Sequence, residues 1–212
     1  QISELPIDFG GFVSSGLITT TDNNYLGTTD DEISPRFTEA AINATFSPFA
    51  RTTVSAQAFV FELGENYGDL SEILLDYGFV DYSVNDWLGI RVGRIKRPQG
   101  LYNTIRDVDL ARTSIFLPQG MYDNRWRDFS SYVDGGSIYG FFFDGALEYE
   151  MYYGSLNLGA QGGLTALVES SGLTVSDISH EGDLYGGQLW WNTPLDGLRV
   201  GQSFYWINEV TT

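Results

Sequence analysis

The feature of this sequence that most constrains its fold is a repeated alternation of apolar and polar residues in segments of strand length. The segment 52–63 shows it, because its apolar residues share one parity: Val54, Ala56, Ala58 and Val60. Ser55 and Gln57 take the other parity. The alternation recurs at 72–83, 87–96, 146–157 and 198–208. Successive side chains of a strand point to opposite faces, so the pattern predicts β-strands with one apolar and one polar face.

The connections between these segments alternate between short and long. We predict strands near 5–20, 36–47, 52–63, 72–83, 87–96, 136–143, 146–157, 183–192 and 198–208. The short connections are rich in Pro, Gly, Asn and Asp and lie at 47–51, 83–86, 144–145 and 192–197. The long ones lie at 22–35, 64–71, 97–135 and 158–182. Short turns at one end and long loops at the other predict an all-β, antiparallel meander whose two ends differ.

Two all-β architectures fit a strand with one apolar face. A soluble sandwich turns its apolar face inward, whereas a transmembrane β-barrel turns it toward lipid and keeps a wet lumen. The sorted connections, and aromatic residues gathered near strand ends, favour the transmembrane barrel. A soluble all-β sandwich that binds a carbohydrate or another ligand is the alternative. No apolar run approaches the roughly 18 residues that a membrane helix needs.

Composition narrows the functional classes. The 212 residues carry a net charge of -17, which disfavours a nucleic-acid partner. There is no Cys, and His180 is the only His, so we expect no metal site and no cofactor. The same scarcity removes the activated nucleophiles and bases of hydrolytic enzymes, and we predict no enzymatic activity.

Basic residues are concentrated in one stretch of this acidic chain. Eight of the 11 Lys and Arg residues lie in it: Arg91, Arg94, Lys96, Arg97, Arg106, Arg112, Arg125 and Arg127. The stretch begins at the end of the fifth predicted strand and fills the long connection 97–135. We therefore expect function to centre on this connection.

The amino-acid sequence of this stretch resembles that of a known protein family. Gly93-Arg94-Ile95-Lys96-Arg97-Pro98-Gln99-Gly100-Leu101-Tyr102-Asn103 is similar to the strand exit of Gram-negative outer-membrane porins related to the phosphate-selective and general porin group. The continuations Arg106-Asp107-Val108-Asp109 and Arg112-Thr113-Ser114-Ile115-Phe116-Leu117-Pro118-Gln119 add to the resemblance. The resemblance implies a channel for passive diffusion of small hydrophilic solutes in the outer membrane. It also implies a third outer loop that folds into the barrel, contacts with lipid and lipopolysaccharide, and a homotrimer.

On this interpretation, segment 97–135 is a constriction loop. The residues predicted to line the constriction are Arg91, Arg106, Arg112, Arg125, Arg127, Arg199, Asp107 and Asp109. Arginines in a narrow section with low-dielectric walls would favour anions, so we predict an anion preference. Two alternatives remain: a mutually neutralised scaffold, or a site for lipopolysaccharide phosphates outside the pore. Arg94 and Lys96 share the parity of the apolar residue Val92 and are expected beyond the membrane at the end of their strand.

Two further predictions concern acidic residues. Asp76, Glu148 and Glu150 are predicted to line the lumen, where they would oppose an anion preference. The segment 21–32 is rich in Asp, Asn and Glu and has oxygen ligands suitable for calcium, but it lacks EF-hand spacing. An ordinary solvated loop is the favoured interpretation of that segment.

The predicted strand number bears on completeness. Nine is odd, whereas bacterial barrels have even numbers and aqueous porins have about 16 to 18 strands. We therefore expect residues 1–212 to form one β-barrel domain that is incomplete at its C-terminal end. A complete barrel of eight or ten strands is the alternative if one strand is misassigned.

Overall fold

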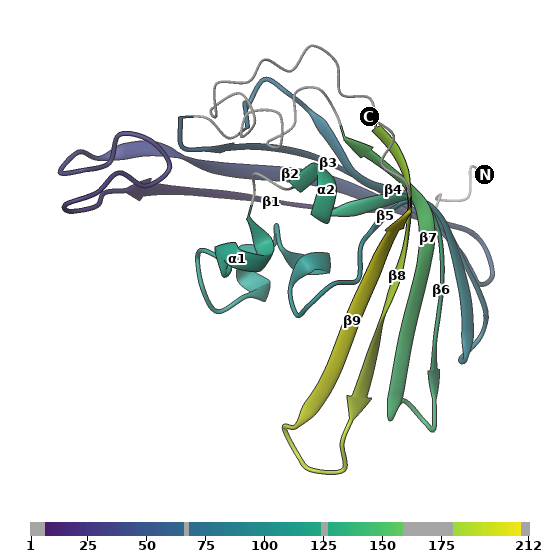
Figure 1. The fold of residues 1–212 in the computed structure, drawn as a ribbon. Coiled ribbons are helices and arrows are strands. Elements are labelled where there is room, and N and C mark those ends of the chain that lie inside the picture. The colour runs from purple at the N-terminus through teal and green to yellow at the C-terminus, as the bar shows by residue number, and fades with distance from the viewer. Residues whose placement is uncertain (1–6, 66–67, 124–126, 159–179, 209–212) are drawn as a thin grey trace.

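The computed structural model describes residues 7–65, 68–123, 127–158 and 180–208, and they form one antiparallel sheet of nine strands (Figure 1). Each strand pairs with its sequence neighbours. The strands are β1 (Ile7–Ile18), β2 (Ser34–Phe49), β3 (Thr52–Leu63), β4 (Leu74–Asn85), β5 (Leu88–Lys96), β6 (Tyr132–Phe142), β7 (Leu147–Leu158), β8 (His180–Asn192) and β9 (Arg199–Asn208). The sheet is not closed, because within the described residues β1 pairs only with β2 and β9 only with β8.

The nine predicted strands and their antiparallel order are confirmed, with boundaries that differ by a few residues. The largest shifts concern β6, which begins at Tyr132 rather than 136, and β8, which begins at His180 rather than 183. Tyr132 to Gly135 pair with Lys96 to Gly93 of β5, so this tertiary pairing extends the strand toward its N-terminal end. The long connection therefore ends at 131 rather than 135.

The strand connections are sorted as the sequence predicts. Those between β2 and β3, β4 and β5, β6 and β7, and β8 and β9 are short turns. Two residues of the β6–β7 turn, Phe143 and Asp144, have positive φ values of 55° and 53°, as expected for a tight hairpin. The longer connections of the described part of the chain lie at the opposite end of the sheet.

The sheet curves strongly, and the connection between β5 and β6 lies on its concave side (Figure 1). We call residues 97–131 the inner loop and the side of the sheet it covers the inner face. The inner loop contains the short helices η1 (Asn103–Ile105), η2 (Asp109–Ala111), α1 (Gln119–Tyr122) and α2 (Arg127–Ser130). None of the helices in the described ranges is long and apolar enough to cross a membrane.

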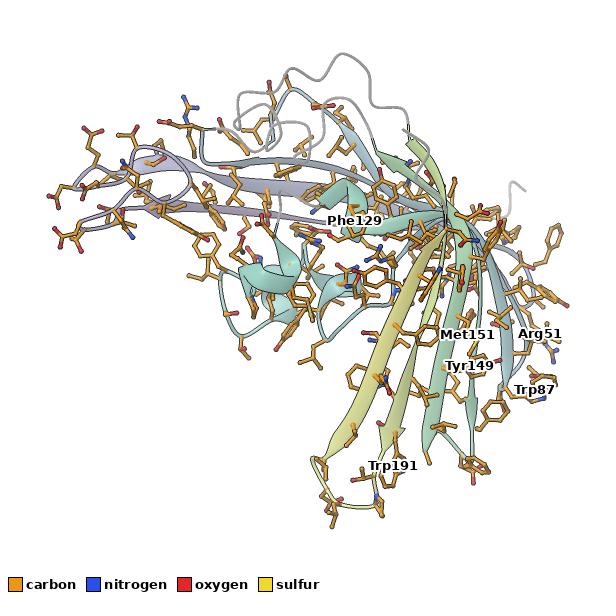
Figure 2. The ribbon with its side chains drawn as sticks, viewed as in Figure 1. Arg51, Trp87, Phe129, Tyr149, Met151 and Trp191 are labelled. Carbon is orange, nitrogen blue, oxygen red and sulfur yellow. The ribbon has the colours of Figure 1, made fainter. Side chains whose placement is uncertain are left out.

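The outer face of the sheet is apolar and exposed. Every strand contributes to it; examples are Phe9, Val13, Ile42, Val54, Val80, Val92, Ile138, Met151, Leu189, Val200 and Trp206. Val13 retains 79% of its accessible surface and Trp206 retains 61%. In Figure 2, Met151 and Trp191 mark this face on β7 and β8, whereas Phe129 of α2 lies on the concave side.

The inner face is mixed, with apolar residues toward the long connections and polar residues toward the short turns. Two apolar clusters pack there: Phe37, Phe59, Phe61 and Leu63 from β2 and β3, and Ile95, Val133, Tyr152 and Leu184 from β5 to β8. The inner loop packs on both clusters, through Phe116 on the first and Phe129 on the second. The hydrophobic core of the described chain thus lies between the inner loop and the sheet.

Candidate functional site

The inner loop is tied to both edges of the sheet. The Gly100 N–H donates to Ser203 Oγ of β9 at 3.1 Å, and the Gly100 carbonyl accepts from Gln188 Nε2 of β8 at 2.6 Å. Farther along the loop, the Ser14 hydroxyl of β1 donates to the Asp109 carboxylate. The loop therefore spans the inner face from β9 to β1.

The centre of the inner loop is held by a buried ion cluster, which consists of Asp76, Lys96, Asp107 and Arg127. Arg127 Nη2 lies 2.9 Å from Asp76 Oδ1, and its Nη1 lies 2.5 Å from Asp107 Oδ1. Lys96 Nζ lies 2.7 Å from Asp76 Oδ2 and also pairs with Asp107. Two cations thus face two carboxylates. The side chains of Asp76 and Asp107 are only 1% and 3% exposed, so this pairing is almost free of solvent screening.

A β-bulge turns Asp76 toward this cluster. Gln57 of β3 pairs with Tyr77 and Ala58 pairs with Leu75, so Asp76 is an extra residue on β4. Gln57 Nε2 donates to Asp76 Oδ2 at 2.8 Å. The bulge also changes the parity of the strand. Tyr77 and Phe79, which the alternation groups with the outward Leu75, lie on the inner face, where the Arg91 guanidinium stacks 4.7 Å from the Phe79 ring centroid.

Lys96 and Arg94, which share one strand parity, make different contacts in the structure. That Lys96 lies beyond the membrane stays a prediction, but its ammonium group joins the buried ion cluster instead of following the parity of Val92. Lys96 is the last residue of β5, where a long side chain is no longer held to strand parity. Arg94 stays away from the cluster and forms a bidentate pair with Asp134, with both N–O distances 2.7 Å.

The charges of the inner loop at this cluster are stable at neutral pH. Burial by itself would raise the pKa of Asp107, but the Arg127 and Lys96 cations outweigh it and hold that pKa well below its ordinary value. Burial by itself would lower the pKa of Arg127, but the neighbouring carboxylates of Asp107 and Asp76 raise it above its ordinary value. Both residues are therefore ionised under ordinary conditions, and the ion pairs persist.

Arg106 forms hydrogen bonds within the inner loop. Its guanidinium donates to Asn103 Oδ1 at 3.3 Å, Ser130 Oγ at 3.1 Å and the Tyr122 carbonyl at 3.1 Å. Burial, together with the like charge of Arg127, lowers the pKa of Arg106 to about 10, so it remains a cation at neutral pH. Arg106 thus connects η1, α1 and the end of α2.

Arg112 and Asp109 form the part of the loop next to β1 and β2. Arg112 Nη2 pairs with Asp109 and lies 3.9 Å from Glu39 Oε2 of β2. The side chain of Arg112 is 5% exposed. Six predicted site residues, Asp76, Arg106, Asp107, Asp109, Arg112 and Arg127, therefore gather between the inner loop and the sheet. They are paired with one another or with backbone groups there.

Four other predicted residues, Arg91, Glu148, Glu150 and Arg199, form a second group nearer the short turns. Arg91 Nε lies 3.1 Å from Asp81 Oδ2, and its Nη1 lies 3.3 Å from Glu150 Oε1. Arg199 Nη2 lies 2.5 Å from Glu148 Oε2, and the Arg199 guanidinium stacks 4.4 Å from the Trp190 ring centroid. Arg91, Glu148, Glu150 and Arg199 retain 21% to 45% of their side-chain exposure, so solvent reaches them.

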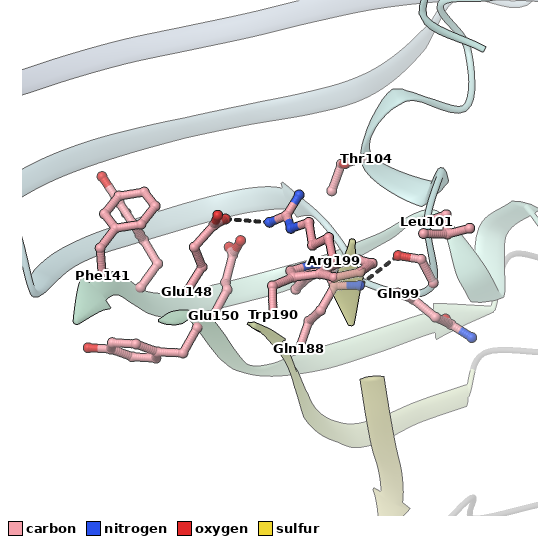
Figure 3. Close-up of a pocket in the computed structure, with 14 residues that line it drawn as sticks. Gln99, Leu101, Thr104, Phe141, Glu148, Glu150, Gln188, Trp190 and Arg199 are labelled. Carbon is pink, nitrogen blue, oxygen red and sulfur yellow. Dashed lines mark hydrogen bonds and ion pairs between the residues drawn. The ribbon is translucent and has the colours of Figure 1, made fainter. Parts of the chain in front are cut away.

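This second group borders a pocket of about 280 Å³ between the inner loop and β6 to β9 (Figure 3). The loop contributes Pro98 to Leu101 and Thr104. The sheet contributes Tyr139, Glu148, Glu150, Gln188, Trp190 and Arg199, among others. In the view of Figure 3, Arg199 lies between Glu148 and the loop residues Leu101 and Thr104.

Sequence reasoning missed two structural residues of this region. Arg97 is fully buried, donates to the Phe129 carbonyl at 2.9 Å and lies 4.9 Å from the Tyr205 ring centroid. Asn103 donates to the carbonyls of Arg97 and Ser130, which closes the base of the inner loop. Arg97 precedes Pro98 in the motif that resembles the porin family. Its position as a charged residue directly after the predicted strand 87–96 was the one sequence feature that could have pointed to its role.

Two residues singled out from the sequence lie outside what the structure describes: all of Arg125 and the side chain of His180. Within the described ranges, no group of three or more His, Asp or Glu side chains is arranged to hold a metal ion.

Comparison with known proteins adds no further assignment. No protein-family model matches this chain, and a search of curated proteins gives no significant match.

Proposed function

We propose that this chain is part of a porin-like β-barrel of the Gram-negative outer membrane, which forms a water-filled channel for passive diffusion of small hydrophilic solutes. In this proposal the nine strands belong to a barrel wall and the inner loop narrows the lumen. The observation that carries it is the inverted distribution of side chains: the apolar face of the sheet is exposed, and the face with the charged residues is covered by the chain's own loop.

The outer face supports a lipid environment. It extends over all nine strands, whereas an apolar patch on a soluble monomer seldom exceeds a few hundred Å². A soluble sandwich would require a second sheet on this face, and the described part of the chain places its only other layer on the inner face. Lipid would cover the outer face without a second sheet.

The inner loop supports a narrowed lumen. It crosses the concave side of the sheet from β9 to β1 and is fixed by ion pairs and by the two apolar clusters. A loop fixed in this way reduces the cross-section available to solutes while keeping its position. The pocket beside Arg199 and Glu148 is a solvent-accessible part of the inner face that it leaves.

The anion preference stays a prediction. The basic residues Lys96, Arg112 and Arg127 pair with carboxylates, and Arg106 binds loop carbonyls and hydroxyls. Of the two alternatives to the constriction interpretation, the neutralised scaffold agrees with these contacts. We therefore assign the loop arginines to holding the loop, and assign contact with solutes to the second group of charged residues.

The partners follow from the same proposal. Outer-membrane lipid and lipopolysaccharide would contact the exposed outer face, and part of that face would be buried in a homotrimer. Small hydrophilic solutes would pass along the inner face. No nucleic acid and no cofactor enter the proposal.

Planar-bilayer recording of the full-length protein extracted in detergent tests this function. We expect stepwise conductance increments of uniform size, and a change in increment size for the variant Asp107→Asn, which weakens the buried ion cluster. A protein that remains soluble without detergent and produces no increments contradicts the proposal. In that case the soluble ligand-binding sandwich becomes the better interpretation.

A further inference from the structure

The pocket between the inner loop and β6 to β9 has the features of a binding site that the ion cluster lacks. It is open to solvent and is lined by both loop and sheet (Figure 3). Its volume of about 280 Å³ is near the lower end of small-molecule sites, which measure roughly 300 to 1,000 Å³. Its size therefore suits a ligand no larger than a small metabolite.

The charges of the pocket wall are already paired. Arg199 pairs with Glu148, and Arg91 pairs with both Glu150 and Asp81. Among the charged residues that line the pocket, the carboxylates of Glu148 and Glu150 thus outnumber the guanidinium of Arg199, and Arg91 pairs with Glu150 from outside the lining. An anion entering the pocket would meet excess negative charge, and a cation would have to compete with arginines for carboxylates that are already satisfied. The pairing favours an uncharged ligand.

The hydrogen-bonding groups of the pocket are mixed. Glu148 and Glu150 supply acceptor oxygens with remaining lone pairs. Arg199 uses Nη2 for Glu148, and its Nε and Nη1 donate to no other group among the described residues. On the loop side, Gln99 accepts from Arg97 through Oε1, which leaves its Nε2 as a donor, and Thr104 is exposed. A hydroxyl group both donates and accepts, so it satisfies such a wall better than a purely donating or accepting group does.

The apolar part of the pocket is flat and aromatic. Trp190 and Tyr139 contribute rings beside these polar groups, and Arg199 lies over one face of Trp190. Guanidinium groups lie over both rings, Arg199 over Trp190 and Arg91 over Tyr139, so the rings offer their edges to C–H surfaces, whereas the carboxylates and donors are suited to hydroxyls. A ligand that has both kinds of surface in a small volume is a sugar or a cyclic polyol.

We propose that the pocket formed by Gln99, Thr104, Glu148, Glu150, Trp190 and Arg199 binds a neutral, polyhydroxylated solute of monosaccharide size. The inference deepens the proposed function, on which it rests for the route by which the solute arrives, because it names the class of solute retained on the inner face. The inner loop, held in place by the buried ion cluster, forms one wall of the site.

The test uses the full-length protein in detergent, with D-glucose, inorganic phosphate and lysine as neutral, anionic and cationic probes. Binding is followed by isothermal titration calorimetry, which requires no pore. We expect saturable binding of D-glucose and weaker or undetectable binding of the two charged probes. Tighter binding of phosphate or lysine than of D-glucose overturns the proposal, and so does the absence of D-glucose binding.

Two variants locate the site. Thr104→Val removes one hydroxyl from the loop wall while preserving shape, and it should weaken D-glucose binding by about threefold to tenfold, the effect of one lost hydrogen bond. The matched control is Thr113→Val, since Thr113 is also exposed on the inner loop but lies outside the pocket. Equal affinity in both variants would place D-glucose elsewhere and overturn the assignment.

Conductance measured on the same preparations separates this proposal from the proposed function. Conductance steps without D-glucose binding would preserve the channel and remove the site. D-glucose binding that is sensitive to Thr104→Val without conductance steps would preserve the site and remove the channel.

Discussion

The inner face carries two groups of ion pairs that are built from the same residue types but differ in burial. In the buried ion cluster, Asp76 and Asp107 are 1% and 3% exposed and bind Lys96 and Arg127. In the pocket, Glu148 and Arg199 pair at 2.5 Å but are 29% and 45% exposed. The cluster lies buried between the inner loop and the sheet, and the pocket lies beside the contact of Gly100 with β8 and β9.

This difference assigns the two groups different roles. A desolvated ion pair is strongly affected when one partner is lost, because the other charge is left buried and uncompensated. A solvated pair contributes little to stability, and its members remain available to another molecule. Arginine and aspartate in the cluster therefore hold the loop, whereas arginine and glutamate in the pocket are free to contact a solute.

The largest effect is expected when one charge is removed from the buried ion cluster. Asp107→Asn leaves Arg127 and Lys96 sharing Asp76, and we expect the free energy of unfolding to fall by about 3 to 5 kcal/mol. Denaturant unfolding in detergent, followed by tryptophan fluorescence, measures it. The matched variant Glu148→Gln should lower the same quantity by less than about 1 kcal/mol. Equal losses in the two variants would contradict the division into holding and contacting groups.

Acid should weaken the cluster through the same residue. The pKa of Asp107 lies below its ordinary value in the folded protein, so its contribution to stability is present above that ordinary value, near 4, and is lost as the pH falls through the folded pKa. We expect the stability difference between the wild-type protein and Asp107→Asn to be constant from pH 7 to about 5 and to shrink below about pH 4. Unfolding curves at several pH values measure this. A stability difference between the wild-type protein and Asp107→Asn that grows as the pH falls would contradict this prediction.

A smaller effect is expected at the edge where the loop meets β9. Ser203→Ala removes the acceptor of the Gly100 N–H, and we expect a loss of about 1 kcal/mol in the free energy of unfolding, with faster amide exchange at Gly100. Ser15→Ala is the matched control, because within the described ranges its hydroxyl bonds to Thr38 alone, at an exposed site. If amide exchange at Gly100 is unchanged, the loop is held without this bond.

The smallest effect on stability, and the clearest on selectivity, is expected in the pocket. Glu148→Gln removes the partner of Arg199 and leaves its guanidinium unpaired, so the reversal potential in a salt gradient should shift toward anions. Asp196→Asn, in the exposed turn between β8 and β9, serves as the control for the loss of one negative charge. A shift of the same size in both variants would indicate general surface charge rather than the pocket.

Much of the fold was predictable from local patterns. Alternation in five segments, together with turn residues such as Asp144-Gly145, identified the nine strands and their hairpins. The position of Arg91 and Arg199 on the polar side of their strands also followed from parity, since neither strand is interrupted between them and their paired neighbours. The parity of Tyr77 and Phe79 was not predictable, because the bulge at Asp76 depends on the partner strand.

The strands, their order, the two-faced character of the sheet and the long basic connection were predictable from the sequence, because each depends on neighbouring residues in the chain. In contrast, the folded structure was needed to show that Lys96 joins Asp76 and Asp107 in a buried cluster, and that Glu148, Thr104 and Arg199 border one pocket. These contacts join residues far apart in sequence, and they depend on how a long loop packs across a curved sheet. Loop packing is governed by burial and charge pairing over the whole inner face. The alternation of residues along one strand does not specify these long-range contacts.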